Sequence, residues 1–251
     1  MEIINNNNND AILFLHGGPG LDSSYLRSWF NSLTTTHNLV FYDQDYKKAE
    51  KSMIDHLCLQ LITLLQSLSH DYESITVYAH SWGSYLFLNT LSKYDESQSM
   101  VNRVIFSNPS ATSWKGFMES GDRLFSKMPQ DILNEISSCS DGVKLMKIAL
   151  PYYVGNANNV PEIPFAKYDL DAYSVAEKEM ENYDISKLVG LLDSNKTFTI
   201  YCENDFEDIS GSPEFNNFSK VIKFSDTGHF PFAERQADYI DLLRSILKDE
   251  L

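Results

Sequence analysis

The amino-acid sequence predicts an α/β fold in which a mostly parallel, twisted sheet is flanked by helices. Short apolar runs of strand length alternate with amphipathic helical stretches over residues 11–106. Strands joined through helices need crossover connections, which are right-handed and make the strands parallel. The 251 residues, 43% of them hydrophobic and 13% aromatic, suit one domain carrying an insertion and are a poor match to a disordered, collagen-like or coiled-coil chain.

The alternating elements follow a run of asparagines at residues 5–9. We expect a solvated loop or tail at this run, with the ordered domain beginning after it. Apolar runs then predict strands at 11–15, 39–42, 74–79 and 103–106. Apolar residues at helical spacing predict helices over 26–33, 54–68 and 82–91, the first of them capped by Asp22 or Ser23.

The alternation stops after Phe106 and resumes near Ile185. Residues 110–183 form a mixed segment, helical in places and without a clear strand, which we expect to be a helical cap inserted over the edge of the sheet. A helix at 185–192, strands at 197–201 and 220–224, and a closing helix at 232–247 complete the pattern. The predicted organisation is therefore an α/β core of residues 1–109 and 184–251 with a cap insertion of residues 110–183.

The charge balance argues against nucleic-acid and membrane partners. Twenty basic residues against 35 acidic ones give a formal net charge of -15, which repels phosphate backbones and anionic lipid. The three cysteines, Cys58, Cys139 and Cys202, show neither close pairing nor metal-ligand spacing. From the first residues and the lengths of the apolar runs we expect neither a signal peptide nor a membrane-spanning segment. We expect a soluble, cytoplasmic protein without cofactor or metal, acting on a neutral or cationic small molecule or a short peptide.

The junction between the strand at 74–79 and the following helix predicts a nucleophile at Ser81. The sequence Ala79-His-Ser-Trp-Gly83 fits the nucleophile-elbow pattern G-x-S-x-G, with alanine at the first glycine. Because this turn is sharp, the residues on either side of the serine must be small, as Ala79 and Gly83 are. Helix capping would explain an isolated serine, but this position after a buried strand favours a hydroxyl group exposed at the end of the sheet and facing the positive end of the helix.

A serine nucleophile needs a base, and His229 is the histidine best placed to supply it. Of the six histidines, His229 alone follows the last predicted strand, in a turn fixed by Gly228 and Pro231. His80 adjoins the serine, and we expect the turn to direct its side chain away. His229 is therefore predicted to reach back over the sheet toward Ser81.

The base needs a carboxylate to fix its tautomer, and Asp205 is predicted to provide it. Asp205 lies four residues beyond Tyr201, at the sheet edge that also carries the serine turn. Neighbouring acids are interpreted as solvated charges; these are Glu203, Glu207, Asp208 and Asp226. Along the chain the three residues come in the order serine, acid, histidine, which is the order expected when the serine sits in a nucleophile elbow.

An oxyanion formed at Ser81 would need two backbone N–H donors. Trp82, directly after the serine, supplies one. The loop His16-Gly-Gly-Pro-Gly20 follows a central strand, and its glycines allow the backbone to approach a ligand closely. Gly18 is the expected second donor, with Gly17 as the alternate.

These motifs together resemble α/β-hydrolase fold proteins, and the HGGPG loop with the A-H-S-W-G turn most resembles the proline iminopeptidase-like branch. The resemblance covers nearly the whole chain outside the insertion. It implies a Ser81–Asp205–His229 triad under a helical cap that shapes the substrate pocket.

The sequence departs from that branch at three places. The iminopeptidase pattern D-Q-R-G-x-G-x-S is reduced to Asp43 and Gln44, without the arginine and glycines. Little sequence precedes the first core strand, so the leading antiparallel strands look absent or reduced. Acidic residues of the insertion are interpreted as solvated rather than amine-binding; these are Glu119, Glu162, Glu177, Glu179 and Glu181.

The leading hypothesis is a serine hydrolase that cleaves a small ester, thioester, lactone or amide through an acyl-enzyme. One alternative is an aminopeptidase that removes an N-terminal proline or another small residue. A further alternative is a binding protein that keeps the fold as a ligand pocket without hydrolysis.

Overall fold

The computed structural model describes residues 1–46, 52–208 and 212–250, and its strands form one sheet of seven. The strand order is β1-β3-β2-β4-β5-β6-β7, in which only β1 runs antiparallel to its neighbour. The bounds are β1 (Glu2–Ile4), β2 (Asp10–Leu15), β3 (Asn38–Tyr42), β4 (Ser74–His80), β5 (Arg103–Ser107), β6 (Thr197–Cys202) and β7 (Lys220–Phe224). The predicted α/β class with a mostly parallel sheet is confirmed.

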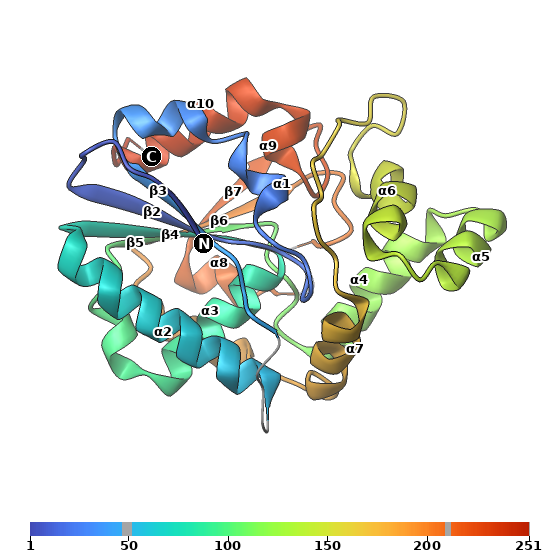
Figure 1. Ribbon diagram of the computed structural model, residues 1–251, viewed down its shortest axis with the longest axis horizontal. Coiled ribbons are helices and arrows are strands. Elements are labelled where there is room, and N and C mark those ends of the chain that lie inside the picture. The colour runs from blue at the N-terminus through green and yellow to red at the C-terminus, as the bar shows by residue number, and fades with distance from the viewer. Residues whose placement is uncertain (47–51, 209–211, 251) are drawn as a thin grey trace.

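Helices cover both faces of the sheet (Figure 1). Because side chains alternate along a strand, Leu13 and Leu15 of β2 pack in one apolar core with α2 and α3, whereas Ile12 and Phe14 pack in the other with α1 and α10. The helices around the sheet are α1 (Ser24–Arg27), α2 (Met53–Asp71), α3 (Trp82–Lys93), α8 (Phe215–Phe218), α9 (Pro231–Glu234) and α10 (Gln236–Leu247). Short 3-10 turns lie at η1 (Asn31–Thr35), η2 (Asp95–Gln98) and η3 (Ser186–Leu191).

Ordered structure begins before the asparagine run, contrary to the prediction. The three residues of β1 pair with β3, with Ile3 opposite Val40, so the leading antiparallel part of the sheet is reduced to one short strand. The asparagines that follow are held by hydrogen bonds. The backbone N–H of Asn6 donates to Asn38 Oδ1 at 2.8 Å, and its side chain donates to the Thr34 carbonyl at 2.7 Å. The run is therefore an exposed loop, as expected, but hydrogen bonds to Thr34 and Asn38 tie it to the domain.

Two predicted helices are each divided in the structure. The helix expected over 26–33 consists of α1 followed by η1. The Ser23 hydroxyl does not cap α1, because it donates instead to Asp43 Oδ1 at 2.6 Å. The closing helix is broken at Arg235 into α9 and α10.

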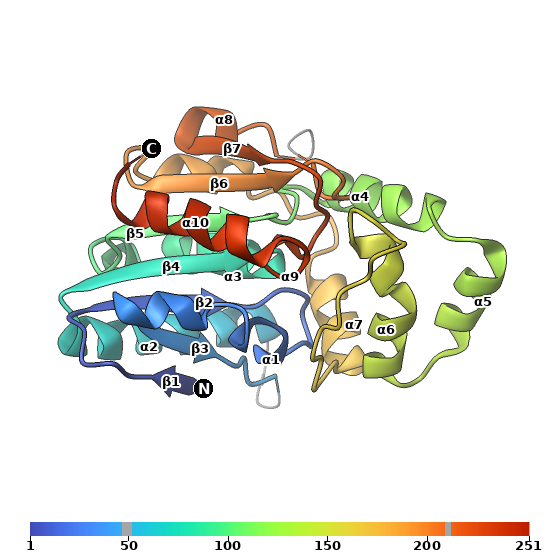
Figure 2. The ribbon, with the colours of Figure 1, turned by 90° about the horizontal axis from the view of Figure 1, so that it is seen from above.

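Four helices of the insertion gather beside the end of the sheet at which the parallel strands finish (Figure 2). They are α4 (Trp114–Ser126), α5 (Gln130–Ser138), α6 (Gly142–Tyr153) and α7 (Leu170–Glu179), all within residues 110–183. The division into core and cap domains stays a prediction. Over the described ranges, no helix is long and apolar enough to cross a membrane, and no cluster of side chains could hold a metal ion.

Candidate active site

Ser81 occupies a strained turn between β4 and α3. Its φ of +51° places a non-glycine residue in the left-handed region, which is costly and common where a side chain is held out for function. The backbone N–H of Ser81 donates to the Ser107 carbonyl at 3.1 Å. A Cβ at Gly83 would lie 2.6 Å from the Leu15 carbonyl oxygen, so the close approach of α3 to β2 requires glycine there.

Asp205 and His229 are brought together from the loops after β6 and β7. The His229 Nδ1 lies 2.9 Å from Asp205 Oδ2 and 3.1 Å from Oδ1, and the two side chains are only 4% and 0% exposed. Glu234 of α9 fixes the histidine loop, because its carboxylate accepts hydrogen bonds from the backbone N–H groups of Gly228 and Phe230. A buried hydrogen bond of this kind selects one imidazole tautomer and leaves Nε2 free.

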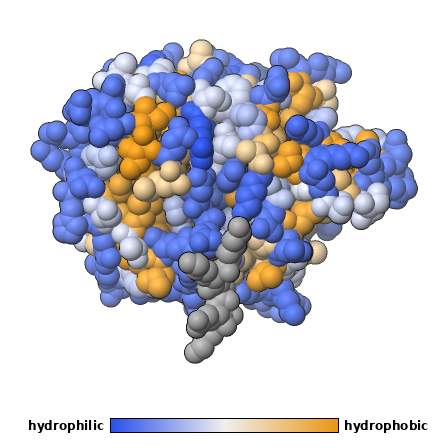
Figure 3. Space-filling view, viewed as in Figure 1, coloured by the Kyte–Doolittle hydropathy of each residue, from blue (hydrophilic) through white to orange (hydrophobic). Residues whose placement is uncertain are grey.

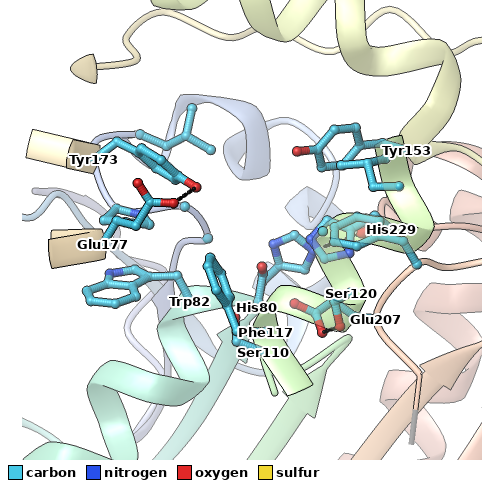
Figure 4. Close-up of a pocket in the computed structure, with 18 of the residues that line it drawn as sticks. His80, Trp82, Ser110, Phe117, Ser120, Tyr153, Tyr173, Glu177, Glu207 and His229 are labelled. Atoms are coloured by element: carbon cyan, nitrogen blue, oxygen red, sulfur yellow. Dashed lines mark hydrogen bonds between the residues drawn. The ribbon is translucent and has the colours of Figure 1, made fainter. Parts of the chain in front are cut away.

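Ser81, Trp82 and His229 line one cavity of about 240 Å³ between the sheet and the insertion helices (Figure 4). Aromatic side chains, including Phe117 and Tyr153, form much of its wall. Among the described residues no hydrogen bond joins the Ser81 hydroxyl to His229. Catalytic hydrogen bonds are often long without substrate and tighten when it binds.

The glycine loop after β2 presents one free N–H group to this cavity. Gly17 is excluded as an oxyanion donor because its N–H already donates to the Tyr25 hydroxyl at 2.5 Å. For the backbone N–H groups of Gly18 and Trp82, by contrast, the described part of the chain offers no acceptor, and both residues line the cavity. These two groups are therefore available to a ligand oxygen.

His80 points toward the site, contrary to the prediction. Its ring is fully buried, with Nδ1 2.8 Å from the Tyr25 hydroxyl and Nε2 2.8 Å from the His229 carbonyl oxygen. Because the Tyr25 oxygen accepts from Gly17, its own hydrogen is free to go to Nδ1, which leaves Nε2–H to donate to His229. Burial keeps the pKa of His80 well below its ordinary value, so this chain of hydrogen bonds holds a neutral imidazole.

Comparison with solved structures identifies the fold. The chain is similar to an esterase from Exiguobacterium antarcticum, with a TM-score of 0.72 and 16% identity over 98% of this chain and 94% of that one. This chain has the α/β-hydrolase fold. It is also similar to a proline iminopeptidase from Mycobacterium smegmatis, with a TM-score of 0.66 and 14% identity over 99% of this chain and 93% of that one. A third similar structure is MenH from S. aureus, with a TM-score of 0.64 and 14% identity over 99% of this chain and 98% of that one. No protein-family model and no curated protein matches the sequence.

At 14–16% identity these likenesses concern the α/β-hydrolase fold alone, so the proline iminopeptidase-like branch stays a prediction. The two residues kept from the iminopeptidase pattern have structural partners. Asp43 Oδ2 accepts from the Arg27 guanidinium at 2.7 Å, and Gln44 Oε1 accepts from the Trp82 indole at 3.0 Å. The rest of that loop, residues 47–51, lies outside the described ranges.

Three acidic residues interpreted as solvated have other surroundings in this α/β-hydrolase fold. Glu207 is only 4% exposed and lines the cavity, and Glu177 lines it on the opposite side, beside Tyr173 (Figure 4). Glu179 accepts hydrogen bonds from the backbone N–H groups of Met53 and Ile54, so it ties α7 to the start of α2. Glu203 and Asp226 are exposed, as expected. No periodicity marks these burials, because the partners come from distant segments.

Proposed function

We propose that this protein is a serine hydrolase that transfers the acyl group of a small ester, thioester, lactone or amide to Ser81 and then to water. The observation that carries the proposal is the 2.9 Å hydrogen bond between His229 Nδ1 and Asp205, because His229 lines the same cavity as Ser81. A carboxylate on Nδ1 orients the ring and stabilises the imidazolium, so Nε2 can serve as the base.

In this mechanism His229 Nε2 takes the proton of the Ser81 hydroxyl as its oxygen attacks the acyl carbon. The N–H groups of Gly18 and Trp82 hold the oxygen that becomes negative. His229 then protonates the leaving group. Afterwards it deprotonates the water that attacks the acyl carbon, and it returns that proton to the Ser81 oxygen as the acyl group is released. Every proton is carried by a group of this chain, so the proposal includes no cofactor or metal.

The cavity supports a small substrate with apolar surface. It encloses about 240 Å³, and aromatic rings such as Phe117, Phe206 and Phe230 line it. The name of the similar esterase supports ester cleavage. The same proposal includes a small molecule or short peptide as substrate and a cytoplasmic location. It includes no nucleic-acid or membrane partner.

A fluorophosphonate probe tests the nucleophile directly. We expect covalent labelling of the native protein at Ser81 and none in Ser81→Ala. Ser110→Ala is the matched control, because Ser110 lines the same cavity and its removal should leave labelling intact. Equal labelling of native protein and Ser81→Ala would overturn the proposal, as would binding of a ligand without turnover that Ser81→Ala leaves unchanged.

An aminopeptidase is a second candidate, and the carboxyl groups of the cavity favour it. Asp122, Glu177 and Glu207 all line the wall, where they could hold a cationic amine. A proline iminopeptidase is also among the similar structures. We expect this activity, if present, to cleave proline p-nitroanilide and to be lost when the proline nitrogen is blocked; equal rates on both compounds would exclude it.

A further inference from the structure

Glu207 is a buried carboxyl group at the candidate site to which the proposed mechanism gives no role. It follows β6, two residues beyond Asp205, and it lines the cavity on the same side as His229 (Figure 4). Its Oε2 accepts a hydrogen bond from the Ser120 hydroxyl of α4 at 2.8 Å. The Arg123 Nη2 donates in turn to the same Ser120 oxygen at 2.8 Å. Helix α4 therefore fixes this carboxyl group against the wall of the cavity.

The cavity offers an anion little compensation. Three of its lining residues carry carboxyl groups, and none of the described lining residues is a lysine or arginine. Arg123, whose charge acts on Glu207, is directed to other partners. Its Nε donates to the Phe206 carbonyl oxygen at 2.8 Å and lies 3.7 Å from Asp208. A carboxylate placed beside an ionised Glu207 would face an unpaired like charge in a region shielded from water.

We propose that Glu207 is a specificity-determining residue that rejects acyl groups carrying a carboxylate when it is ionised and admits them when it is protonated. The inference rests on the proposed hydrolase function, because acyl groups enter the cavity only as parts of substrates. A protonated Glu207 has an O–H to donate, which turns the same side chain from a repelling group into a hydrogen-bond donor.

The balance between the two forms falls near neutral pH. Burial, followed by the nearby charge of Asp205, raises the pKa of Glu207 to about 7. The other titratable and charged groups around it are His229, Arg123 of α4, Tyr153 of α6, Tyr183 and Tyr201 of β6. The three tyrosines have raised pKa values, so they stay neutral through this range. Above the Glu207 pKa, admitting an anion requires proton uptake, which weakens binding by about tenfold for each pH unit.

Two matched esters isolate this effect. p-Nitrophenyl butyrate and p-nitrophenyl hemisuccinate share the leaving group and the chain length, but the second ends in a carboxylate. The measured quantity is the ratio of their kcat/KM values, hemisuccinate over butyrate, between pH 6 and pH 9. Because both esters use Ser81 and His229, titration of the base cancels from the ratio. We expect the ratio in the native protein to fall about 15-fold between pH 7 and pH 8.5, because half of the Glu207 carboxyl groups are already ionised at pH 7.

Variants assign the fall to Glu207. In Glu207→Gln we expect a ratio that does not change with pH. Glu177→Gln, which removes a carboxyl group from the opposite wall, should keep the fall. Ser120→Ala removes a hydrogen bond that favours the ionised form, so the midpoint should move to higher pH. If Glu207→Gln does not fold, the native protein and Ser120→Ala carry the test.

The result separates this inference from the proposed function. Butyrate hydrolysis that disappears in Ser81→Ala supports the hydrolase, whatever the ratio does. A pH-independent ratio in the native protein, or the same fall in Glu207→Gln, would overturn the role of Glu207 alone. Absence of butyrate hydrolysis that depends on Ser81 would overturn both.

Discussion

The side chain of Asn108 donates a hydrogen bond to the Oδ2 of Asp205, the same oxygen that lies 2.9 Å from His229 Nδ1. Asn108 follows β5, is fully buried and has a φ of +50°, a conformation that asparagine tolerates better than most residues. Its amide also lies 3.4 Å from the Gly228 carbonyl oxygen. Asn108 thus joins the loops that carry the proposed acid and base.

Removal of this amide should impair turnover more than binding. Asn108→Gly keeps the backbone conformation accessible, and we expect it to lower kcat by on the order of 10²-fold with little change in KM, because Asp205 loses one of the contacts that orient it. Steady-state kinetics on a p-nitrophenyl ester measure this split. Asn182→Gly is the matched control, since Asn182 is an exposed asparagine with a φ of +65°. Equal kcat values for the two variants would show that Asn108 does not position Asp205.

The Tyr25 hydroxyl should contribute to stability as well as to the site. Tyr25→Phe leaves two buried groups, the Gly17 N–H and His80 Nδ1, without their partner. We expect a loss of about 1–3 kcal/mol in the free energy of unfolding, measured by urea denaturation. Tyr94→Phe, at a partly exposed ring, should change it by less than about 0.5 kcal/mol. A Tyr25→Phe protein as stable as Tyr94→Phe would contradict this account.

Packing of the insertion against the glycine loop predicts a strong effect at Gly20. Its φ is +93°, and a Cβ there would lie 2.3 Å from the Asp169 carbonyl oxygen, just before α7. Gly20→Ala should therefore destabilise the protein by about 3 kcal/mol, through backbone strain and overpacking together. Gly121→Ala provides the contrast, because its Cβ would meet only the Phe125 ring at 3.8 Å within α4. Alanine is a better helix former than glycine, so the free energy of unfolding of Gly121→Ala should rise by up to about 1 kcal/mol. Urea denaturation measures both variants, and a similar loss of stability in the two would refute the explanation.

The raised pKa of Glu207 also predicts how stability depends on pH. Its pKa is about 7 in the folded protein against 4.5 when unfolded, so the folded state binds the extra proton between these values. The difference in unfolding free energy, native minus Glu207→Gln, should fall by about 3 kcal/mol as the pH rises from 4.5 to 8.

The two buried histidines act in the opposite direction. The pKa values of His16 and His80 are lowered by burial, so their contribution is present above pH 6.5 and is lost as the pH falls. Both histidines are present in the native protein and in Glu207→Gln, so their contributions cancel when one unfolding free energy is subtracted from the other. Guanidinium denaturation of the two proteins at several pH values measures this difference. A difference that stays constant with pH would show that Glu207 is not the group responsible.

Elements with a strong local pattern were predictable from the sequence. The apolar run of β2 and the long amphipathic stripe of α2 fall where the sequence places them. The weaker first helix divides into α1 and η1, a break that the apolar spacing did not indicate. The hydroxyl of Ser23, one of the two expected caps of α1, bonds instead to Asp43, 20 residues away. β1 escaped prediction because a three-residue strand has too little pattern to recognise, and its partner β3 supplies the reason that it forms.

Periodicity and turn residues act between near neighbours in the chain, so they were enough to predict the fold class and to nominate Ser81, Asp205 and His229. Tertiary structure decided which side chains meet. It placed Asp205 against His229, directed His80 inward and buried Glu207 against Ser120, which lies 87 positions earlier. The physical reason is that burial and hydrogen-bond partners come from elements distant in sequence, and those surroundings set the charge of an acidic side chain.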